Sequence, residues 1–521
     1  MRAAEASAVT DIPTDAVTNI GGSPLQVLPV VTKELDKSKP DIEHALVEDD
    51  PRSWSDTRKT AILFIISGAS VIAGLCANIQ NPANAQIEQQ LHASSGQISL
   101  SLSLFILVQG NFPVLWSAVS EIKGRKLVYL ASVSFFTLGS AIVAISKSIG
   151  LFIGMRILQA IGSSAVLSIG AATLADIYEP HQRGAKVGVY YCAPLLGPSL
   201  GPIIGGVLTQ AFSWRAVFWF LVIWGGVIFS AFLALFKDTF RRERSLTYQN
   251  VLRRRTNGGK RVSKESPKDI EAQPPIATAV DAKDITLSFA DVNPFPPYVN
   301  ILRRKNNLVI LMPSGLLFAF GFSITYTCAR TLALYYDYDA LKTGLVLLSF
   351  GIGSMLGSIL GGRWSDRTLA RLKAANGGVS FPEMRLESTK IAMWGLPPAV
   401  IGYAWVCQER VHIAAMCVML FLAGFFSIWM YSSTLAYVVD SNTGNSSSAV
   451  AANSSIRGAS AFVAAEVAVP LQDAIGDGGL YTIWAGLMLF AELVILLVLY
   501  RGKQWREASI EKEKRRSAGV R

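Results

Sequence analysis

Two short stretches of the chain place an acidic side chain next to basic ones at the end of a long apolar run. The first extends from Ser117 to Lys126 and the second from Gly362 to Arg367. In each stretch a small residue stands four positions before the acid, and an arginine or lysine follows it. Ion pairs at the end of a helix can hold one of two packing arrangements. The two stretches therefore predict a conformational latch made of Ser117, Glu121, Gly124, Arg125, Lys126, Gly362, Asp366 and Arg367.

Glycine recurs at every fourth position in two of the apolar runs. The two sets are Gly197, Gly201, Gly205 and Gly353, Gly357, Gly361. Because residues four apart share one face of a helix, each set predicts a face without side chains, where another backbone can approach closely. Two prolines in the first run, Pro198 and Pro202, each remove a backbone donor and predict a bend.

Charged side chains also lie inside the apolar runs, where they cost free energy and therefore tend to face water or a partner. Arg156 and Gln159 lie in one run. Asn453 and Arg457 are four residues apart in another and so share a helix face. Glu466 lies nine residues beyond Arg457 and does not share its face. Two interpretations of Arg156 remain open. It can be a functional group inside the protein, or its side chain can extend to the nearby membrane surface.

Amide and hydroxyl side chains gather near one end of the first apolar run and recur in later runs. They can supply hydrogen bonds in an otherwise apolar cavity, or they can bond neighbouring helices, and the sequence leaves both interpretations open. The cavity candidates are Asn78, Gln80, Asn81, Gln109, Tyr326, Asn453 and Arg457.

The elements that must position these residues are membrane-spanning helices. The chain of 521 residues is 51% apolar and 16% charged, and its apolar residues form about twelve stretches of roughly twenty residues, long enough to cross a bilayer. This pattern predicts an all-α integral membrane protein with twelve transmembrane helices in two pseudo-symmetric six-helix bundles. The expected organisation is a disordered cytoplasmic N-terminus (1–59), the first bundle (60–236), a cytoplasmic linker (237–306), the second bundle (307–500) and a basic cytoplasmic tail (501–521).

The net charge of +11 is a topology signal, not a mark of nucleic-acid binding. Basic residues concentrate in the loops on one side of the predicted membrane, which places both termini and the central linker in the cytoplasm. The five cysteines have no CxxC spacing and no metal-ligand cluster is apparent, so neither disulfides nor a metal site is expected. No P-loop or nucleophile elbow occurs, so we expect no enzyme activity and no cofactor.

Several of these motifs together resemble the major facilitator superfamily. The first latch stretch is similar to the loop between its spans two and three, written G-x-x-x-D-R/K-x-G-R/K-R/K, with Ser117 and Glu121 as departures. The run Gly197, Pro198, Gly201, Pro202, Gly205 and Gly206 resembles the antiporter motif of the drug:proton antiporters. Arg156-x-x-Gln159 resembles their R-x-x-Q-G motif, with Ala160 in place of glycine.

The resemblance covers residues ~55–500 and is closest to the twelve-span drug:proton antiporters of fungi. It implies a monomeric plasma-membrane protein that exports a small molecule against protons by alternating access. It also implies that spans five and eight, which carry the glycine faces, pack across the boundary between the halves. Arg156, Gln159 and Glu466 are the candidates for proton coupling. Because the deep charges are mainly Arg156 and Arg457, the expected substrate is amphipathic and neutral or anionic.

Three other functions fit parts of the sequence. An exporter of organic acids or siderophores and a facilitator without proton coupling would share the same fold. A nutrient receptor with a transporter-like membrane domain would signal through its long terminal segments. The antiporter motif argues against this last alternative.

Overall fold

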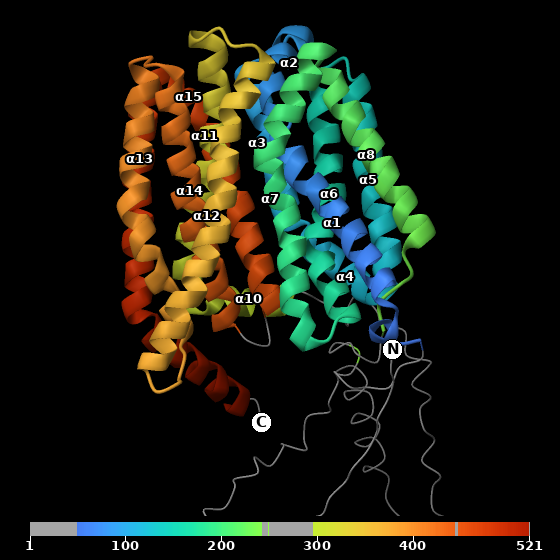
Figure 1. Cartoon of the computed structure of the whole chain (residues 1–521), viewed down its shortest axis with the longest axis vertical. Helices are drawn as coiled ribbons and strands as arrows, with labels where there is room; N and C mark the ends of the chain where they lie inside the picture. Colours follow the sequence, from blue (N-terminus) through green and yellow to red (C-terminus); the bar gives the residue numbers. More distant parts are fainter. Residues whose placement is uncertain (1–48, 242–247, 249–294, 443–445, 520–521) are drawn as a thin grey trace, which may run out of the picture. The chain divides into compact units, whose positions relative to one another are not determined.

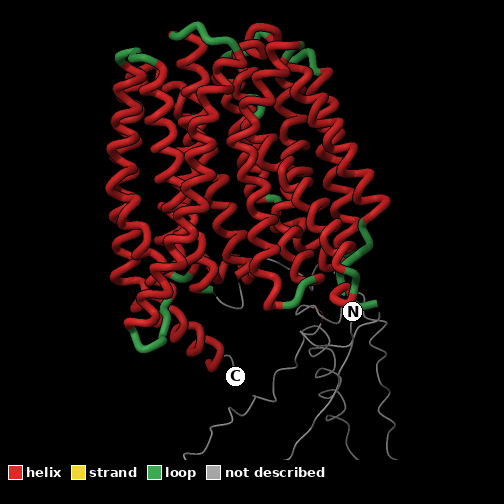
Figure 2. The backbone as a smooth tube through the Cα atoms, in the orientation of Figure 1, coloured by secondary structure: helices red, strands yellow, loops and turns green. Residues whose placement is uncertain are grey.

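The computed structural model describes residues 49–241, 248, 295–442 and 446–519, which lie in one compact unit. The described residues form helices joined by short loops, without a strand (Figure 2). The predicted disorder of residues 1–59 falls mostly outside the described part. Within that segment the structure describes a short 3-10 helix, η1 (Pro51–Ser53), and the start of the first long helix.

The N-terminal bundle comprises the helices before the central linker. They are α1 (Asp56–Asn78), η2 (Asn81–Ala83), α2 (Asn84–Leu91), α3 (Ser95–Asn111), α4 (Pro113–Lys123), α5 (Arg125–Ile145), α6 (Ile149–Ile177), α7 (Pro180–Ala211) and α8 (Trp214–Leu235). The C-terminal bundle comprises α10 (Phe295–Arg303), α11 (Lys305–Tyr335), α12 (Ala340–Ala375), η5 (Pro382–Thr389), α13 (Lys390–Gln408), α14 (Ile413–Ser441) and α15 (Ser446–Gly519). Figure 1 shows the two groups on opposite sides.

The described helices give twelve spans when two irregular ones are resolved and α7 and α13 are included. Among the described residues, eight helices are long and apolar enough to cross a membrane on their own. The second span is a ninth, but it is broken into α3 and α4 by a bend of 41° at Pro113. α15 contains two spans, which separate at Gly476, where φ is +71°. With α7 and α13 these helices complete the predicted two sets of six.

The break in α15 has a local cause. A positive φ of +71° suits glycine, whereas a side chain there would be strained. Gln408 at the end of α13 stabilises the turn, because its Oε1 accepts a hydrogen bond of 3.0 Å from the backbone N–H of Gly478. The same oxygen lies 2.7 Å from the position that a Cβ on Gly476 would occupy. Gln408 therefore satisfies one of the backbone N–H groups at the start of the last span.

The prediction that the four-residue glycine sets form the interface between the bundles is wrong. Gly201 and Gly205 face Asn78 and Ile79 at the end of α1, inside the N-terminal bundle. Likewise Gly353, Gly357 and Gly361 face Phe421, Phe425 and Trp429 of α14, inside the C-terminal bundle. Each smooth face is used to pack a bundle internally.

Other small residues of α7 and α12 join the two bundles. A Cβ on Gly206 would lie 2.5 Å from the carbonyl oxygen of Ala340. Gly344 meets the carbonyl oxygen of Pro202, and Gly351 packs on Ser199. The fifth and eighth spans thus do meet across the boundary, as expected, but on a face one residue away from the predicted stripe. α3 and α15 form the second contact between the bundles, where Gly110 packs against Gly458.

Candidate functional site

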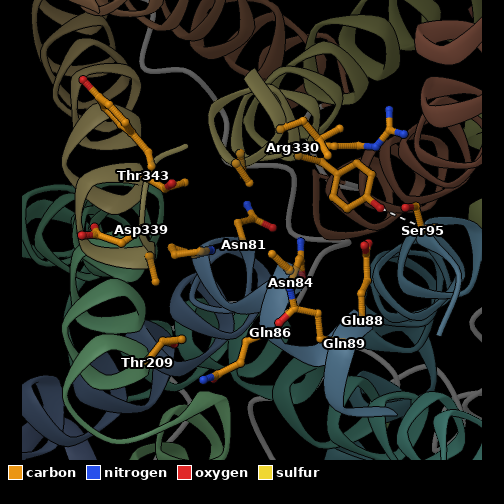
Figure 3. Close-up of a pocket in the computed structure, with 18 of the residues that line it drawn as sticks. Asn81, Asn84, Gln86, Glu88, Gln89, Ser95, Thr209, Arg330, Asp339 and Thr343 are labelled. Carbon is orange, nitrogen blue, oxygen red and sulfur yellow. Dashed lines mark hydrogen bonds between the residues drawn. The ribbon is translucent and has the colours of Figure 1, made fainter. Parts of the chain in front are cut away.

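A cavity of about 410 Å³ lies between the two bundles, near one end of the helices. The N-terminal bundle lines it with η2, α2 and the ends of α3 and α7, and the C-terminal bundle lines it with α11 and α12 (Figure 3). We call this end of the bundles the cavity end. The opposite end, which carries the predicted latch residues, is called the latch end. Figure 1 shows that α1 begins and α15 finishes at the latch end.

The cavity is polar, and part of its lining lacks hydrogen-bond partners within the protein. Asn81 is only 3% exposed, yet neither polar atom of its side chain is bonded to another described residue. The hydroxyl of Thr209, 6% exposed, is also unbonded. Opposite them, the Tyr326 hydroxyl donates a hydrogen bond of 3.1 Å to the carbonyl of Ser95. Buried polar groups are normally bonded, so this cavity is suited to a solute that forms hydrogen bonds.

The other amide candidates do not line this cavity. Asn78 donates to the carbonyl of Gly74 in its own helix, at 3.1 Å. Gln109 donates to the carbonyl of Ala73 and to the hydroxyl of Ser163, both at 3.1 Å. The Gln80 side chain donates to Asn84 at 3.0 Å. For Gln109 the alternative that the sequence had left open, a bond to neighbouring helices, is the arrangement observed, whereas Asn78 bonds within its own helix.

Asn453 and Arg457 lie elsewhere in the C-terminal bundle, on the first half of α15. Asn453 accepts a hydrogen bond of 2.7 Å from Ser314. The Arg457 guanidinium carbon stands 3.7 Å from the ring centre of Phe318 and 5.0 Å from that of Tyr431. Its Nε is buried without a hydrogen-bond partner, and no described carboxylate forms an ion pair with it. Aromatic faces thus hold this cation in place without neutralising its charge.

Arg156 is fully buried, which excludes the alternative in which it reaches the membrane surface. It donates to the side-chain oxygen of Gln159 at 2.5 Å and to the carbonyl of Cys76 at 3.3 Å, and it stacks over Phe105. Gln159 in turn donates to Ser140 at 2.7 Å. Because the members of R-x-x-Q are three residues apart in α6, one helix face brings them together.

Glu466 contacts the opposite bundle. Its carboxylate bonds the hydroxyl of Ser103 on α3, and one turn away the Ser99 hydroxyl donates to the carbonyl of Ala465 at 2.6 Å. The sequence analysis identified Glu466 but not the two serines. Their alternation with leucine in an otherwise apolar run (Ser99 to Ser103) was the available signal.

The latch residues form two separate networks, one in each bundle. In the first, Arg125 pairs with Asp176 at 3.2 Å and bonds Ser120, while its backbone N–H donates to Asp238 at 3.1 Å. Gly124 has φ +87°, and Asp238 occupies the space that a Cβ there would need. Lys126 donates to the carbonyl of Leu233 instead of joining this network. The sequence placed Asp176 in a loop network at the end of the fourth span, but it did not predict that Asp176 or Asp238 would bind Arg125, because both lie far along the chain.

In the second network the partner of Asp366 is Arg385 of η5, not the adjacent Arg367, which is exposed. Arg385 also pairs with Asp440 at the end of α14. Burial alone lowers the pKa of Arg385, but the hydrogen bonds to Asp440 and Asp366 outweigh it and raise that pKa above its usual value. The guanidinium therefore remains charged and ties three helical elements together. The second latch stretch, Gly362 to Arg367, does not end the helix: α12 continues to Ala375, so Gly362 lies inside it.

Two helical bundles that enclose a polar cavity in an apolar exterior define an integral membrane transporter. Comparison with known proteins gives the same class. The family model described as Major Facilitator Superfamily matches residues 66–465, and the chain belongs to that family.

Three proteins similar to this chain are fungal transporters. The chain is 27% identical to the MFS antiporter QDR3 of Candida albicans, over 88% of this chain and 80% of that protein. It is 28% identical to the multidrug transporter DTR1 of Candida glabrata, over 88% and 87% of the two chains. Citrate exporter 1 of Aspergillus niger is 26% identical, over 89% and 90%.

Solved structures share the fold. The D-xylose-proton symporter superposes with a TM-score of 0.60 at 12% identity, covering 84% of this chain and 97% of that one. The human organic anion transporter MFSD10 superposes with a TM-score of 0.54 at 17% identity, covering 84% and 99%. These similarities confirm the all-α major facilitator fold predicted from the sequence.

Proposed function

We propose that this protein is a proton-coupled antiporter that exports a small amphipathic compound, neutral or anionic, by alternating access. The observation that carries the choice of substrate charge is Arg457, a cation held between Phe318 and Tyr431 with no described acid beside it. In a medium of low dielectric constant such a site attracts anions and repels cations. The adjacent rings offer an apolar surface for the remainder of the solute.

The contacts between the bundles support a rocking motion. α7 meets α12 through backbone-to-backbone packing, and α3 meets α15 through Gly110 and Gly458. Surfaces without side chains can separate and re-form without side-chain rearrangement. The polar cavity then serves as the exit, where Asn81 and Thr209 provide hydrogen bonds to the departing solute. The two latch networks keep each bundle rigid while the bundles move against each other.

The proposed protein is a monomer in the plasma membrane. Its latch end faces the cytoplasm. The basic residues of the inner loops support this orientation. The central linker, most of which lies outside the described residues, would then be cytoplasmic. Residues 501–519 continue α15 as a helix, with Arg506 paired to Glu383 at 3.0 Å, so the basic tail is attached to the C-terminal bundle.

Transport by the purified full-length chain in liposomes tests the proposal. Vesicles with an imposed pH gradient are supplied with citrate, with quinidine or with spermidine, chosen as a carboxylate, an amphipathic amine and a polycation. Gradient-dependent transport of citrate, or of an uncharged amphipathic drug in a parallel assay, is the expected result. Robust gradient-dependent transport of spermidine contradicts the assigned substrate charge, and transport unaffected by the gradient contradicts proton coupling.

An organic-acid exporter is the second candidate, and it agrees with the same observation. A carboxylate can pair with the Arg457 guanidinium, and one of the relatives is a citrate exporter. Selective transport of citrate over uncharged drugs would favour this narrower function.

A further inference from the structure

The contact between Glu466 and Ser103 joins the two bundles through an ionisable group, and the arrangement of its hydrogen bonds depends on protonation. Glu466 belongs to α15 and Ser103 to α3, so separation of the bundles breaks this bond. Ser103 also lies 3.1 Å from the carbonyl of Leu100 in its own helix. A serine hydroxyl has one hydrogen to donate, so it can serve either the carboxylate or the carbonyl.

Protonation of Glu466 resolves this competition. The neutral carboxyl group donates its proton to the Ser103 oxygen, and Ser103 donates to Leu100, so both acceptors are satisfied and no charge remains. When Glu466 is ionised, Ser103 must turn away from Leu100, and the carboxylate keeps a single donor from α3 in an apolar contact. Separation of the bundles ends this competition, because it removes Ser103 from the carboxylate and exposes the carboxylate to water.

α3 offers Glu466 no charged partner, because no ionisable side chain occurs in that helix. Tyr326 and Arg330 on α11 and Glu88 on α2 are the charged or titratable groups of the same neighbourhood. The Arg330 guanidinium is already bound to Gln472 at 2.9 Å and to Asp473 at 2.7 Å. Further along α15, Asp477 is bonded to Thr331 and Gln472.

We propose that Glu466 is the proton-carrying residue, and that its protonation closes the cavity end by bonding α15 to Ser103 of α3. Loss of the proton opens that end. The inference deepens the proposed antiport, because it specifies which residue exchanges the proton and which interface responds. In the proposed orientation a proton taken up at the cavity end favours closure there, as an inward proton flux requires.

Accessibility of the cavity measures this equilibrium without any substrate. The reporter Thr343→Cys lies in the cavity lining (Figure 3). Its alkylation by a maleimide is timed for the protein in lipid nanodiscs, where both faces are accessible, and is followed by peptide mass spectrometry, which distinguishes it from the five native cysteines. The chemistry of the thiol itself depends on pH. Each rate is therefore divided by the rate for the same reporter in a Glu466→Gln background at the same pH.

We expect this ratio to rise as the pH is raised from a low to a high value, by up to about tenfold per pH unit, because one released proton can shift the equilibrium by that factor. Ser103→Ala removes the acceptor and should raise the labelling rate at the lower pH. Ser101→Ala is its matched control, since that hydroxyl bonds only Ile98 in its own helix at 2.8 Å. Glu492→Gln, in the last span, should leave the ratio as in the parent.

A ratio that does not change with pH overturns the role of Glu466. A pH response of the ratio that disappears in Glu492→Gln assigns the proton to the other acid and likewise overturns the inference. Failure of the proposed antiport is recognised separately, because it would appear as absent gradient-driven flux in liposomes while the labelling ratio still responds to pH.

Discussion

Gly205 and Gly206 are neighbours in α7 that face different bundles. Substitution of Gly205 should therefore impair folding, whereas substitution of Gly206 should impair the movement of the bundles against each other. Gly205 faces the carbonyl of Ile79 in the same bundle, whereas a Cβ on Gly206 would lie 2.5 Å from the carbonyl oxygen of Ala340 in the other bundle. An ordinary contact between these atom types needs about 3.3 Å. Gly206→Ala therefore pushes α7 and α12 apart by about 0.8 Å, or else forces the closed contact open.

The expected magnitude follows from the packing loss. A gap of this size forfeits about a quarter to a half of the dispersion energy of the contact, and overpacked sites typically cost about 1–3 kcal/mol. Because the contact belongs to one arrangement of the bundles, that cost shifts the equilibrium between arrangements by about 5- to 150-fold. Gly205→Ala disturbs packing inside a bundle in every arrangement, so its cost falls on folding.

The assay compares the abundance of folded protein, measured by size-exclusion chromatography, with gradient-driven flux per folded molecule in liposomes. We expect Gly206→Ala to keep abundance and lose at least about fivefold in flux. Gly205→Ala should instead lose abundance. Gly226→Ala is the control, since no atom lies within 4 Å of its Cβ position. Flux of Gly206→Ala equal to that of Gly226→Ala would refute the assignment of this α7 face to the moving interface.

Three further predictions concern charge and topology. Arg457→Ala should reduce citrate flux by about tenfold or more, because a buried charge-assisted bond is worth about 1.5–3 kcal/mol, and should reduce the flux of an uncharged drug less. The control is the exposed Arg371→Ala. Equal losses of citrate and drug flux, or a citrate flux equal to that of the control, would contradict a carboxylate site. Arg125→Ala should cut flux severely, because it removes the ion-pair partner of the half-buried Asp176, whereas Lys126→Ala should do less. Comparable effects of the two variants on flux would argue against a specific latch. The sequon at Asn453 should carry no glycan in a eukaryotic host, and an endoglycosidase shift at that site would contradict its burial in the membrane.

Local sequence was sufficient for the helices, for their number and for several candidate sites. A run of roughly twenty apolar residues can satisfy its backbone groups in a bilayer only as a helix, so composition alone predicts the spans. Spacing also predicted that Asn453 and Arg457 share a face, since side chains four residues apart on a helix lie together, and both contact Tyr431. Gly124 and Arg125 were recognised from their motif alone.

Tertiary structure decided which faces meet. The glycine stripes of α7 and α12 are genuine smooth faces, but no local signal states whether such a face packs on α1, on α14 or on the opposite bundle. Asp366 found its partner in Arg385 and not in the adjacent arginine, because the loop after α12 folds η5 back against it. Glu466 gained its significance from Ser103, which lies 363 residues away in the chain. Periodicity determines the geometry within a helix, whereas contacts between helices depend on how all their faces pack at once, and that information is not local.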